Sequence, residues 1–451
     1  MSGWLLIGLL VLTIVFIVFS TARLKLHPFL ALLVAAYGLG LLAGLPPLEV
    51  ITAITEGFGG TVGSIGIIIA AGTIIGVVLE RSGGAQVMAD TIIGWVGQAR
   101  SVFAMSLTGA AVSVPVFCDS GFVILAPLAR SLASKSGRSM AVYATALSMG
   151  LYATHVFVPP TPGPIAAAGT LQADVGLVIL LGLVVTLPVL VTTYLFARFM
   201  GDRIFLDPDL ATPEGAASGA AADGPPPRSP AAWRAFLPIV LPVVLIALNS
   251  VAAFPTAPFG DGALAGLLNF LGNPNTALLL GVAVAFFVTA QVRGEALTQD
   301  AVSSSLRVAG PIILITGAGG ALGSVLRTTP ITDFLGQNLA LTSLGIFLPF
   351  LLAAALKTAQ GSSTVAIITS AAIIAPLVST LGLGSSTGLA LTTLAIGAGA
   401  MTVSHANDSY FWVVSQFSGM SVSQAYRLQT VGSAVAGITG ILAVFVLNLF
   451  L

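Results

Sequence analysis

Residues 341–378 read LTSLGIFLPFLLAAALKTAQGSSTVAIITSAAIIAPLV, an apolar stretch broken near its middle by Gln360-Gly361-Ser362-Ser363-Thr364. Each limb beside this break is short for a full membrane crossing, which needs about 20 helical residues. Residues 101–129 have the same pattern, with the break at Cys118-Asp119-Ser120-Gly121. Both stretches predict re-entrant hairpins with polar tips. Two full spans in each stretch remain the alternative, because hydropathy alone does not distinguish the two layouts.

The rest of the chain is also suited to lipid. Of its 451 residues 56% are hydrophobic and 7% are charged, whereas soluble domains carry about 25% charged residues. The N-terminus lacks the basic beginning of a cleavable signal and reads as the first span. Hydropathy predicts ten spans, at 4–20, 26–45, 62–80, 139–158, 174–198, 234–252, 275–291, 308–326, 386–404 and 427–450. The predicted fold is therefore an all-α polytopic membrane protein with about ten spans and two hairpins, or 12 hydrophobic segments by hydropathy.

One segment is polar enough to lie outside the membrane. Residues 201–235 contain five acidic residues, three consecutive prolines and many alanines and glycines, a composition typical of a disordered linker. This linker divides the chain into a first membrane half, residues 1–200, and a second, residues 236–451.

The two halves resemble each other in sequence. Short matches occur in the same order and at nearly the same offset. They pair Ala71-Gly72 with Ala318-Gly319, Ser120 with Ser363, Ala126-Pro127-Leu128 with Ala375-Pro376-Leu377, and His155 with His405. Five spans in each half would insert the second half upside down. The pattern predicts an inverted repeat, the architecture behind alternating access in many secondary transporters.

The basic residues predict an orientation. With both termini outside the cytoplasm, nearly all of the 16 Lys and Arg residues fall on the cytoplasmic side, together with the linker. The exceptions are Arg327, which falls outside, and Lys357, which lies in the second hairpin. The positive-inside rule therefore favours this orientation in a cytoplasmic (inner) membrane.

Several classes of function are disfavoured by composition. The net charge is zero, which argues against a nucleic-acid partner. A single cysteine, Cys118, excludes an intrachain disulfide and a multi-thiolate metal site. Neither a nucleophile–base pair nor a metal site is evident, so we expect no cofactor, no metal and no enzymatic activity. Polar residues gather at central breaks rather than along several helices, which argues against a channel.

Non-helical backbone at membrane depth occurs only where it is buried in protein or lines a wet cavity. Besides the two hairpin tips, breaks are predicted at 154–164, which contains four prolines, and at 404–410. Helix N-termini at such breaks favour an anionic substrate group, and hydroxyls there can bind a polyol. The candidate substrate-binding residues are Ser120, Gly121, Thr161, Lys357, Gly361, Ser362, Ser363, Thr364, Asn407 and Ser409.

The ionisable residues at these breaks are further candidates. A lone Lys357 beside the second tip is expected to pair with a substrate carboxylate, or else to extend its ammonium group to the membrane interface. Asp119 and Asp408 could carry a coupled proton, or simply cap helices. His155 and His405 could relay protons, or donate to backbone carbonyls.

These motifs together resemble the gluconate permease (GntP) family. The resemblance rests on His27-Pro28-Phe29, the run from Phe117 to Pro127, Val158-Pro159-Pro160, Gly361-Ser362-Ser363-Thr364 and the run from His405 to Trp412. It implies secondary transport of gluconate, a related sugar acid or D-serine, usually with protons. Sodium coupling remains the alternative, and a homodimer stays open. Familiar members carry Glu-Val-Gly where this chain has Asp119-Ser120-Gly121, and often His in place of Thr161, which bears on the choice of substrate.

Overall fold

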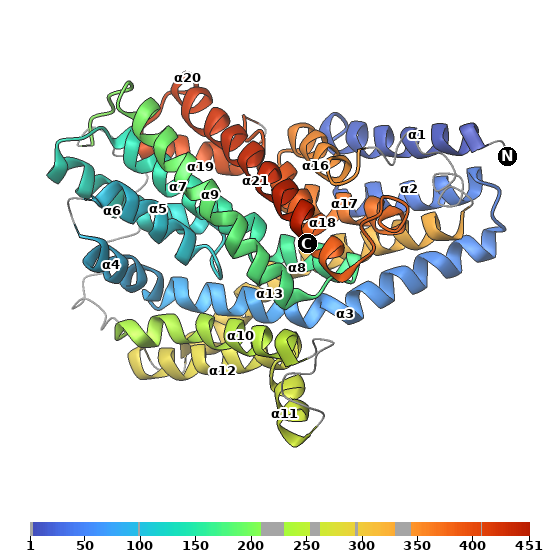
Figure 1. Cartoon of the computed structure of the whole chain (residues 1–451), viewed down its shortest axis with the longest axis horizontal. Helices are drawn as coiled ribbons and strands as arrows, with labels where there is room; N and C mark the ends of the chain where they lie inside the picture. Colours follow the sequence, from blue (N-terminus) through green and yellow to red (C-terminus); the bar gives the residue numbers. More distant parts are fainter. Residues whose placement is uncertain are drawn as a thin grey trace.

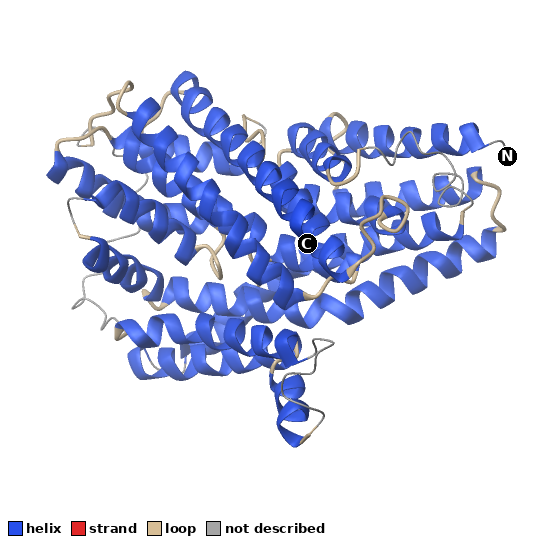
Figure 2. Ribbon diagram, viewed as in Figure 1, coloured by secondary structure: helices blue, strands red, loops and turns tan. Residues whose placement is uncertain are grey.

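The computed structural model describes residues 3–97, 100–208, 230–252, 262–293, 296–329, 344–406 and 408–451, and all regular elements in these ranges are helices (Figure 2). The first half contains α1 (Gly3–Ala22), α2 (Pro28–Leu42), α3 (Pro47–Arg81), α4 (Gly84–Val96), α5 (Ser101–Val112), α6 (Cys118–Ser136), α7 (Met140–Phe157), α8 (Pro162–Leu171) and α9 (Val175–Gly201). The second half contains α10 (Ala232–Ala252), α11 (Ala263–Leu271), α12 (Pro274–Arg293), α13 (Ala296–Thr328), α16 (Phe347–Gln360), α17 (Ser363–Ile374), η3 (Ala375–Leu377), α18 (Ser386–Met401), α19 (Ser409–Ser418), α20 (Val422–Ala425), η4 (Tyr426–Thr430) and α21 (Val431–Phe450).

Several of these helices are suited to a membrane. Among the described residues, five helical stretches are long and apolar enough to cross it, and the number reaches seven if each of two bent pairs is one span. Six further apolar helices are shorter, among them α2, α5, α16, α17 and α18. Many large hydrophobic side chains on the outer helices are exposed, as expected for surfaces that contact lipid.

The two longest helices, α3 and α13, pack against each other along the length of the molecule (Figure 1). They are antiparallel, because Gly57 of α3 lies against Gly320 of α13 while Arg81 reaches Asp300. Both are longer than the spans predicted at 62–80 and 308–326. The sequence prediction stopped short at charged residues such as Glu49 and Glu56, which the structure places on the exposed face of α3.

The centre of the molecule is formed by α7 and α18. Every residue of α7 is buried, and α18 is buried along most of its length. The helices α5 and α9 pack on α7, and α16 and α21 pack on α18, so the two central helices are separated from lipid by protein. A central position explains how helix breaks at their ends are tolerated, because freed backbone groups there face other polar groups rather than lipid.

Each interrupted stretch forms two short helices around a break. The helices α16 and α17 are separated by Gly361 and Ser362, and Gly361 has φ +82°, a conformation that favours glycine. The first break lies slightly before the predicted tip, at 113–117 between α5 and α6. Asp119 and Ser120 therefore occupy the first turn of α6 rather than a loop.

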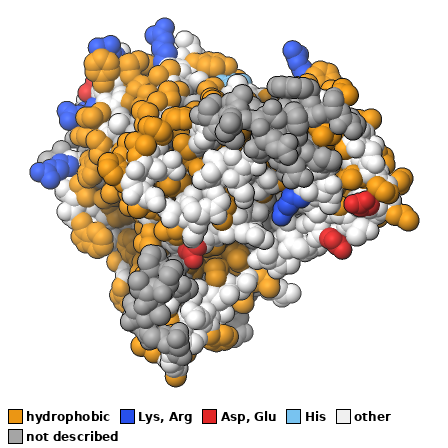
Figure 3. All heavy atoms as spheres, turned by 45° about the vertical axis from the view of Figure 1, so that its right-hand side comes forward, with side chains coloured by type: hydrophobic (Ala, Val, Ile, Leu, Met, Phe, Trp, Pro, Cys, Tyr) orange, Lys and Arg blue, Asp and Glu red, His pale blue; other side chains and the backbone are white. Residues whose placement is uncertain are grey.

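The predicted linker, 201–235, lies largely outside the described residues. Its described ends show α9 closing at Gly201 and α10 beginning at Ala232. The surface view shows most of the visible Lys and Arg side chains along the upper and left margins, and the Asp and Glu side chains largely elsewhere (Figure 3). The basic residues are thus unevenly distributed over this face.

The contact between α3 and the first break depends on a small residue. A Cβ added at Gly76 would overlap the carbonyl oxygen of Pro115. We expect Gly76→Ala to destabilise the protein by about 1–3 kcal/mol, the usual cost of overpacking. The measurement is the thermal unfolding midpoint in an uncharged detergent.

Gly63 of the same helix is the matched control. Nothing lies within 4 Å of a Cβ placed there, so Gly63→Ala is expected to be neutral or slightly stabilising, because alanine is the better helix former. Equal midpoints for the two variants would show that the α3–Pro115 contact is not tight.

Candidate functional site

A buried ion pair lies where the second interrupted stretch meets the break after α18. Lys357 Nζ in α16 is 2.6 Å from Asp408 Oδ2, and the exposed fractions of the two side chains are 0% and 5%. Both charges are therefore removed from water. Such a pair is stable only when good geometry and additional hydrogen bonds offset the cost of desolvation.

The helix breaks supply those hydrogen bonds. Lys357 Nζ donates to the carbonyl oxygen of Gly361, 2.6 Å away, which α16 leaves free where it ends. Asp408 Oδ2 accepts from Ser404 Oγ at 2.5 Å. Asp408 Oδ1 accepts from the backbone N–H of Tyr410 at 3.2 Å, so Asp408 is also the N-cap of α19. The capping role considered from the sequence is present together with the ion pair.

A chain of buried polar groups continues behind Asp408. Gln429 donates to Ser404 Oγ at 3.5 Å and accepts from Ser148 Oγ of α7 at 2.6 Å. Gln429 belongs to η4, a single π-helical turn, a feature frequent at functional sites. Tyr410 OH donates to the carbonyl oxygen of Ser148 at 2.9 Å. These bonds connect α7 of the first half with α19 and η4 of the second.

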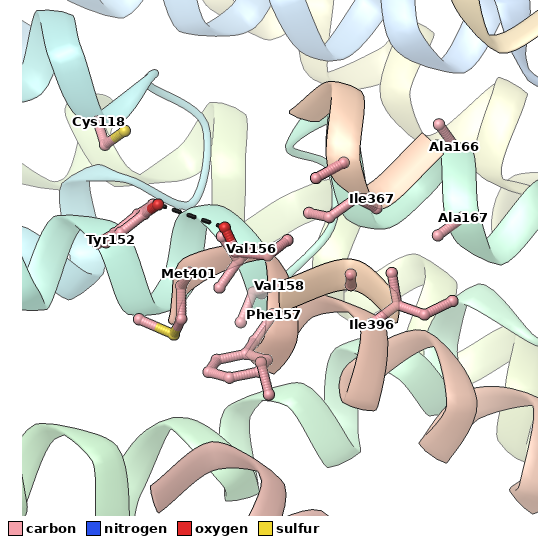
Figure 4. Close-up of a cluster of buried hydrophobic side chains, with 14 of the residues drawn as sticks. Cys118, Tyr152, Val156, Phe157, Val158, Ala166, Ala167, Ile367, Ile396 and Met401 are labelled. Carbon is pink, nitrogen blue, oxygen red and sulfur yellow. Dashed lines mark hydrogen bonds between the residues drawn. The ribbon is translucent and has the colours of Figure 1, made fainter. Parts of the chain in front are cut away.

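Tyr152 of α7 connects the ion pair to α17 and α18. Its hydroxyl lies 2.6 Å from Ser363 Oγ and 3.4 Å from the carbonyl oxygen of Ala400. Figure 4 draws one hydrogen bond of this hydroxyl. Lys357 Nζ lies 5.8 Å from the centre of its ring, within the range of a cation–π interaction. The Tyr152 and Tyr410 rings are 5.3 Å apart. Aromatic faces thus form one wall of the site.

Asp119 of the first interrupted stretch reaches the same region. Its Oδ1 accepts from Ser409 Oγ at 3.3 Å, and the Cys118 thiol points to its Oδ2 at 3.6 Å. The Asp119 and Asp408 carboxylates lie close enough to interact electrostatically. The N-terminus of α6 has no side-chain cap, so its free N–H groups favour negative charge there.

Four helices begin around this site in two pairs. The start of α6 lies beside the start of α19, through Asp119 and Ser409. The start of α8 lies beside the start of α17, where Gly163 faces Thr364 and Ile367. In each pair one helix comes from an interrupted stretch and the other from a break in the opposite half of the chain.

The structure places the two histidines differently. His155, near the end of α7, is buried and close enough to Lys357 and Asp408 to interact with their charges. Within the described part of the chain, its Nδ1 has no hydrogen-bond partner. His405 is partly exposed, and its Nε2 lies 2.9 Å from the carbonyl oxygen of Thr358, one residue beyond Lys357.

Other candidates lie at the margin of this region. The Thr161 hydroxyl donates to the carbonyl oxygen of Val158 within the break. Ser120 lies within hydrogen-bonding reach of Glu80 on α3. Gly121 packs against Leu151. Ser362 uses its hydroxyl to cap α17. Asn407 lies outside the described residues.

Apolar side chains seal the break between α7 and α8. Figure 4 shows Val156, Phe157 and Val158 gathered with Ile396 and Met401 of α18, and all five are at most 1% exposed. Electrostatic interactions beside such an apolar core are stronger than in water.

Sequence reasoning missed Tyr152, Ser404 and Gln429. The sequence holds a weak signal for each. Tyr152 lies one helical turn before His155, Ser404 directly precedes His405, and Gln429 is an amide near the start of an apolar span. None of these signals indicates that the three residues meet at Lys357 and Asp408.

The whole arrangement resembles solved transporters. The structure matches the YdaH transporter of Alcanivorax borkumensis with a TM-score of 0.60 at 17% identity, covering 93% of this chain and 97% of that one. It matches MtrF of Neisseria gonorrhoeae, described as one of a class of antimetabolite efflux pumps, with a TM-score of 0.63 at 16% identity over 95% and 96% of the two chains. The fold is therefore that of an all-helical membrane protein.

The particular family follows from sequence similarity. The GntP family permease model matches residues 4–450. A gluconate permease of Pseudomonas aeruginosa is 35% identical over 100% of this chain and 99% of its own length. The high-affinity gluconate transporter of Escherichia coli is 31% identical over 95% of each chain, and its D-serine transporter DsdX 33% over 98% of each. The chain belongs to the GntP permease family, as its motifs suggested, and is not an enzyme.

The contribution of the Lys357–Asp408 pair to the free energy of unfolding can be measured against that of an exposed pair of the same length. Either Lys357→Gln or Asp408→Asn leaves one buried charge without its partner. Each is expected to cost about 3–5 kcal/mol, and the double variant less than the sum. The measurement is a double-mutant cycle on thermal unfolding midpoints.

The matched control is Arg81–Asp300, also 2.6 Å long but with side chains 33% and 67% exposed. Arg81→Gln and Asp300→Asn are expected to cost about 0–1 kcal/mol, as exposed pairs do. Additive effects in the Lys357–Asp408 cycle would contradict the ion pair.

Proposed function

We propose that this protein is a secondary active transporter that couples proton entry to uptake of gluconate or a related small hydroxy-carboxylate. The Lys357–Asp408 pair carries the proposal. It is a buried cation whose counter-ion can be neutralised by a proton. If Asp408 takes up a proton, Lys357 loses its partner, and a substrate carboxylate can take its place without leaving an unpaired charge in the membrane.

The surroundings supply what such a substrate needs. Free N–H groups at the start of α6, which has no side-chain cap, favour a carboxylate. Hydroxyl groups of Ser409, Ser362 and Ser363 lie at the helix starts around the pair and suit a hydroxylated chain. The proposed substrate-binding residues also include Lys357, Gly361, Thr364, Ser120, Gly121, Thr161 and Asn407.

The curated relatives support a carboxylate substrate. They are named for gluconate and for D-serine, which differ in size but share a carboxylate and at least one hydroxyl group. A site built on one lysine and the uncapped start of α6 suits that common part. The alternative is a Na⁺-coupled transporter of organic acids, D-serine or another amino acid, because hydroxyls and carbonyls at broken helices also suit Na⁺.

We further propose that the two halves, 1–200 and 236–451, form an inverted repeat that works by alternating access. Support comes from the matching order of elements, since α3, α5, α6, α7 and α8 correspond to α13, α16, α17, α18 and α19. In this proposal the two interrupted stretches are re-entrant hairpins. The termini then lie on the outer side of the inner membrane, and the linker lies in the cytoplasm. A homodimer is compatible with these observations.

The decisive experiment is uptake of labelled gluconate into proteoliposomes, with pH and Na⁺ gradients imposed separately. Accumulation driven by an inward proton gradient alone is expected. Accumulation driven only by Na⁺ would favour the Na⁺-coupled alternative. Transport of D-serine without gluconate uptake under any gradient would show that the substrate is an amino acid rather than a sugar acid.

We propose that Asp119 shares the coupled proton with Asp408, because the two carboxylates lie close enough to interact electrostatically. Asp119→Asn is expected to abolish proton-driven accumulation and to retain some exchange of substrate across the membrane. Exchange can proceed with a permanently neutral site, whereas coupling needs a group that takes up and releases a proton. The measurements are accumulation and counterflow in the same vesicles.

Asp300→Asn is the control, because Asp300 is an exposed carboxylate at the far end of α13 from Gly320. It should retain both activities. Unchanged accumulation in Asp119→Asn would exclude Asp119 and leave the proton role with Asp408, His155 or His405.

The role of Lys357 in binding is tested by affinity. Lys357→Gln is expected to weaken carboxylate binding by about 1.5–3 kcal/mol, roughly ten- to a hundredfold, the worth of a charge-assisted hydrogen bond. Lys357→Arg should do less harm, because a cation remains, although its planar group has a different shape. Isothermal titration on folded variants measures this. Wild-type affinity in Lys357→Gln would remove the residue from the site and leave helix N-termini as the anion's partners.

A further inference from the structure

A cavity away from the ion pair is lined by arginines. It has a volume of about 490 Å³ and lies where α5 begins, α6 meets α7 and α9 ends. Its lining residues are Arg100, Ser101, Val102, Phe103, Ser136, Arg138, Tyr143, Tyr194 and Arg198. Among these described residues there are three arginines and no carboxylate, so the cavity is strongly positive.

The cavity also contains a helix N-terminus. Four of its lining residues, 100–103, are the N-cap and first turn of α5, a helix of 12 residues without a side-chain cap. The first N–H groups of such a helix have no intrahelical partner, and they carry the positive end of the helix dipole. An anion in the cavity would satisfy them.

The floor of the cavity is a buried hydroxyl network. Tyr143, 0% exposed, donates to Ser136 Oγ at 3.0 Å and lies 2.6 Å from Ser101 Oγ. On the opposite wall, Arg198 donates to Tyr194 OH at 3.2 Å, and the Tyr194 ring packs edge-on against Phe103 at 5.6 Å. These contacts hold the polar groups in place before any ligand arrives.

Two of the arginines are available to a ligand. Within the described part of the chain, neither Arg100 nor Arg138 has an ion-pair partner. Arg198 interacts with Asp202 one turn further along, and this carboxylate is not part of the cavity lining. Guanidinium groups bind phosphate oxygens in a bidentate manner, which makes several of them around one cavity a phosphate-binding arrangement.

We propose that this cavity binds a phosphate ester. Three guanidinium groups, the free N–H groups of α5 and the tyrosine hydroxyls together match the several acceptor oxygens and the negative charge of a phosphate group. The volume also accommodates the glycerol or sugar portion that carries the phosphate. The phosphate comes either from the headgroup of an anionic phospholipid, whose acyl chains would lie along the exposed Leu187, Val191 and Leu195 of α9, or from a soluble phosphorylated metabolite. The proposal is independent of the transport proposed above.

The test uses the purified full chain in an uncharged maltoside detergent. The first arm measures binding by the shift of the unfolding midpoint with inorganic phosphate or glycerol 3-phosphate, against sodium chloride of equal ionic strength. The second arm counts bound lipid by native mass spectrometry, with phosphatidylglycerol against phosphatidylcholine of the same chain length. A midpoint rise in the first arm assigns a soluble ligand, and selective retention of phosphatidylglycerol assigns a lipid.

Variants connect either result to the cavity. Arg100→Gln and Arg138→Gln are each expected to weaken binding about tenfold, the loss of one charge-assisted hydrogen bond. The affinity of Arg138→Lys is expected to lie between those of Arg138→Gln and the wild type. Lysine keeps the positive charge but lacks the planar guanidinium group that bonds two phosphate oxygens at once. Arg203→Gln is the matched control, since Arg203 is exposed, stacks on Phe199, follows the end of α9 and is not among the residues that line the cavity.

Two results would overturn the proposal. One is that neither phosphate nor phosphatidylglycerol acts on the wild type beyond its salt or neutral-lipid control. The other is that Arg203→Gln reduces binding as much as Arg138→Gln, which would indicate general attraction to a basic surface.

Discussion

The buried ion pair between Lys357 and Asp408 is the interaction on which the arrangement of the surrounding helices depends. Two charges with exposed fractions of 0% and 5% lie inside a membrane protein, and each has to be surrounded by hydrogen-bonding groups to be stable there. Regular helices offer few such groups, because their backbone donors and acceptors bond to each other. The interruptions after α16 and α18 free a carbonyl at Gly361 and an N–H at Tyr410, and these are the groups that the pair uses.

Interruptions of this kind need shelter from lipid. The two central helices provide it, because α7 is buried at every residue and α18 along most of its length. Helix α3 also approaches the first break closely, because Gly76 lies beside the carbonyl of Pro115. The glycines on α3 and the apolar side chains around Val156 and Phe157 therefore serve the same purpose. They keep the freed backbone groups at the breaks, and the charges that bond to them, among protein atoms and away from lipid.

The sequence predicts the class of fold and the location of the helix breaks better than it predicts which side chains contact each other in the site. Composition and the interrupted apolar stretches indicate an all-helical membrane protein, and the motifs indicate its family. Lys357 is identifiable as a lone cation in an apolar limb, but Asp408 lies in another break, and the geometry of two breaks is not encoded in helical periodicity. The same limit applies to Tyr152 and Gln429, which sit in apolar helices and meet the pair only through tertiary packing. The long α3 and α13 were underestimated because exposed charges near their ends resemble loop residues in a hydropathy scan.

Burial of the pair also has a consequence for coupling under the proposed function. Separation of Lys357 from Asp408 with nothing in exchange would leave two uncompensated charges, at a cost of several kcal/mol each. Arrival of a proton at Asp408 removes one of these charges, and arrival of a carboxylate at Lys357 compensates the other. Neither event alone neutralises the site, so each lowers the cost of the other. A favourable coupling free energy between proton and anion then follows from desolvation alone, and by linkage it acts equally in both directions. No separate device is needed to link the two, because a single buried cation with one titratable partner already makes their binding interdependent.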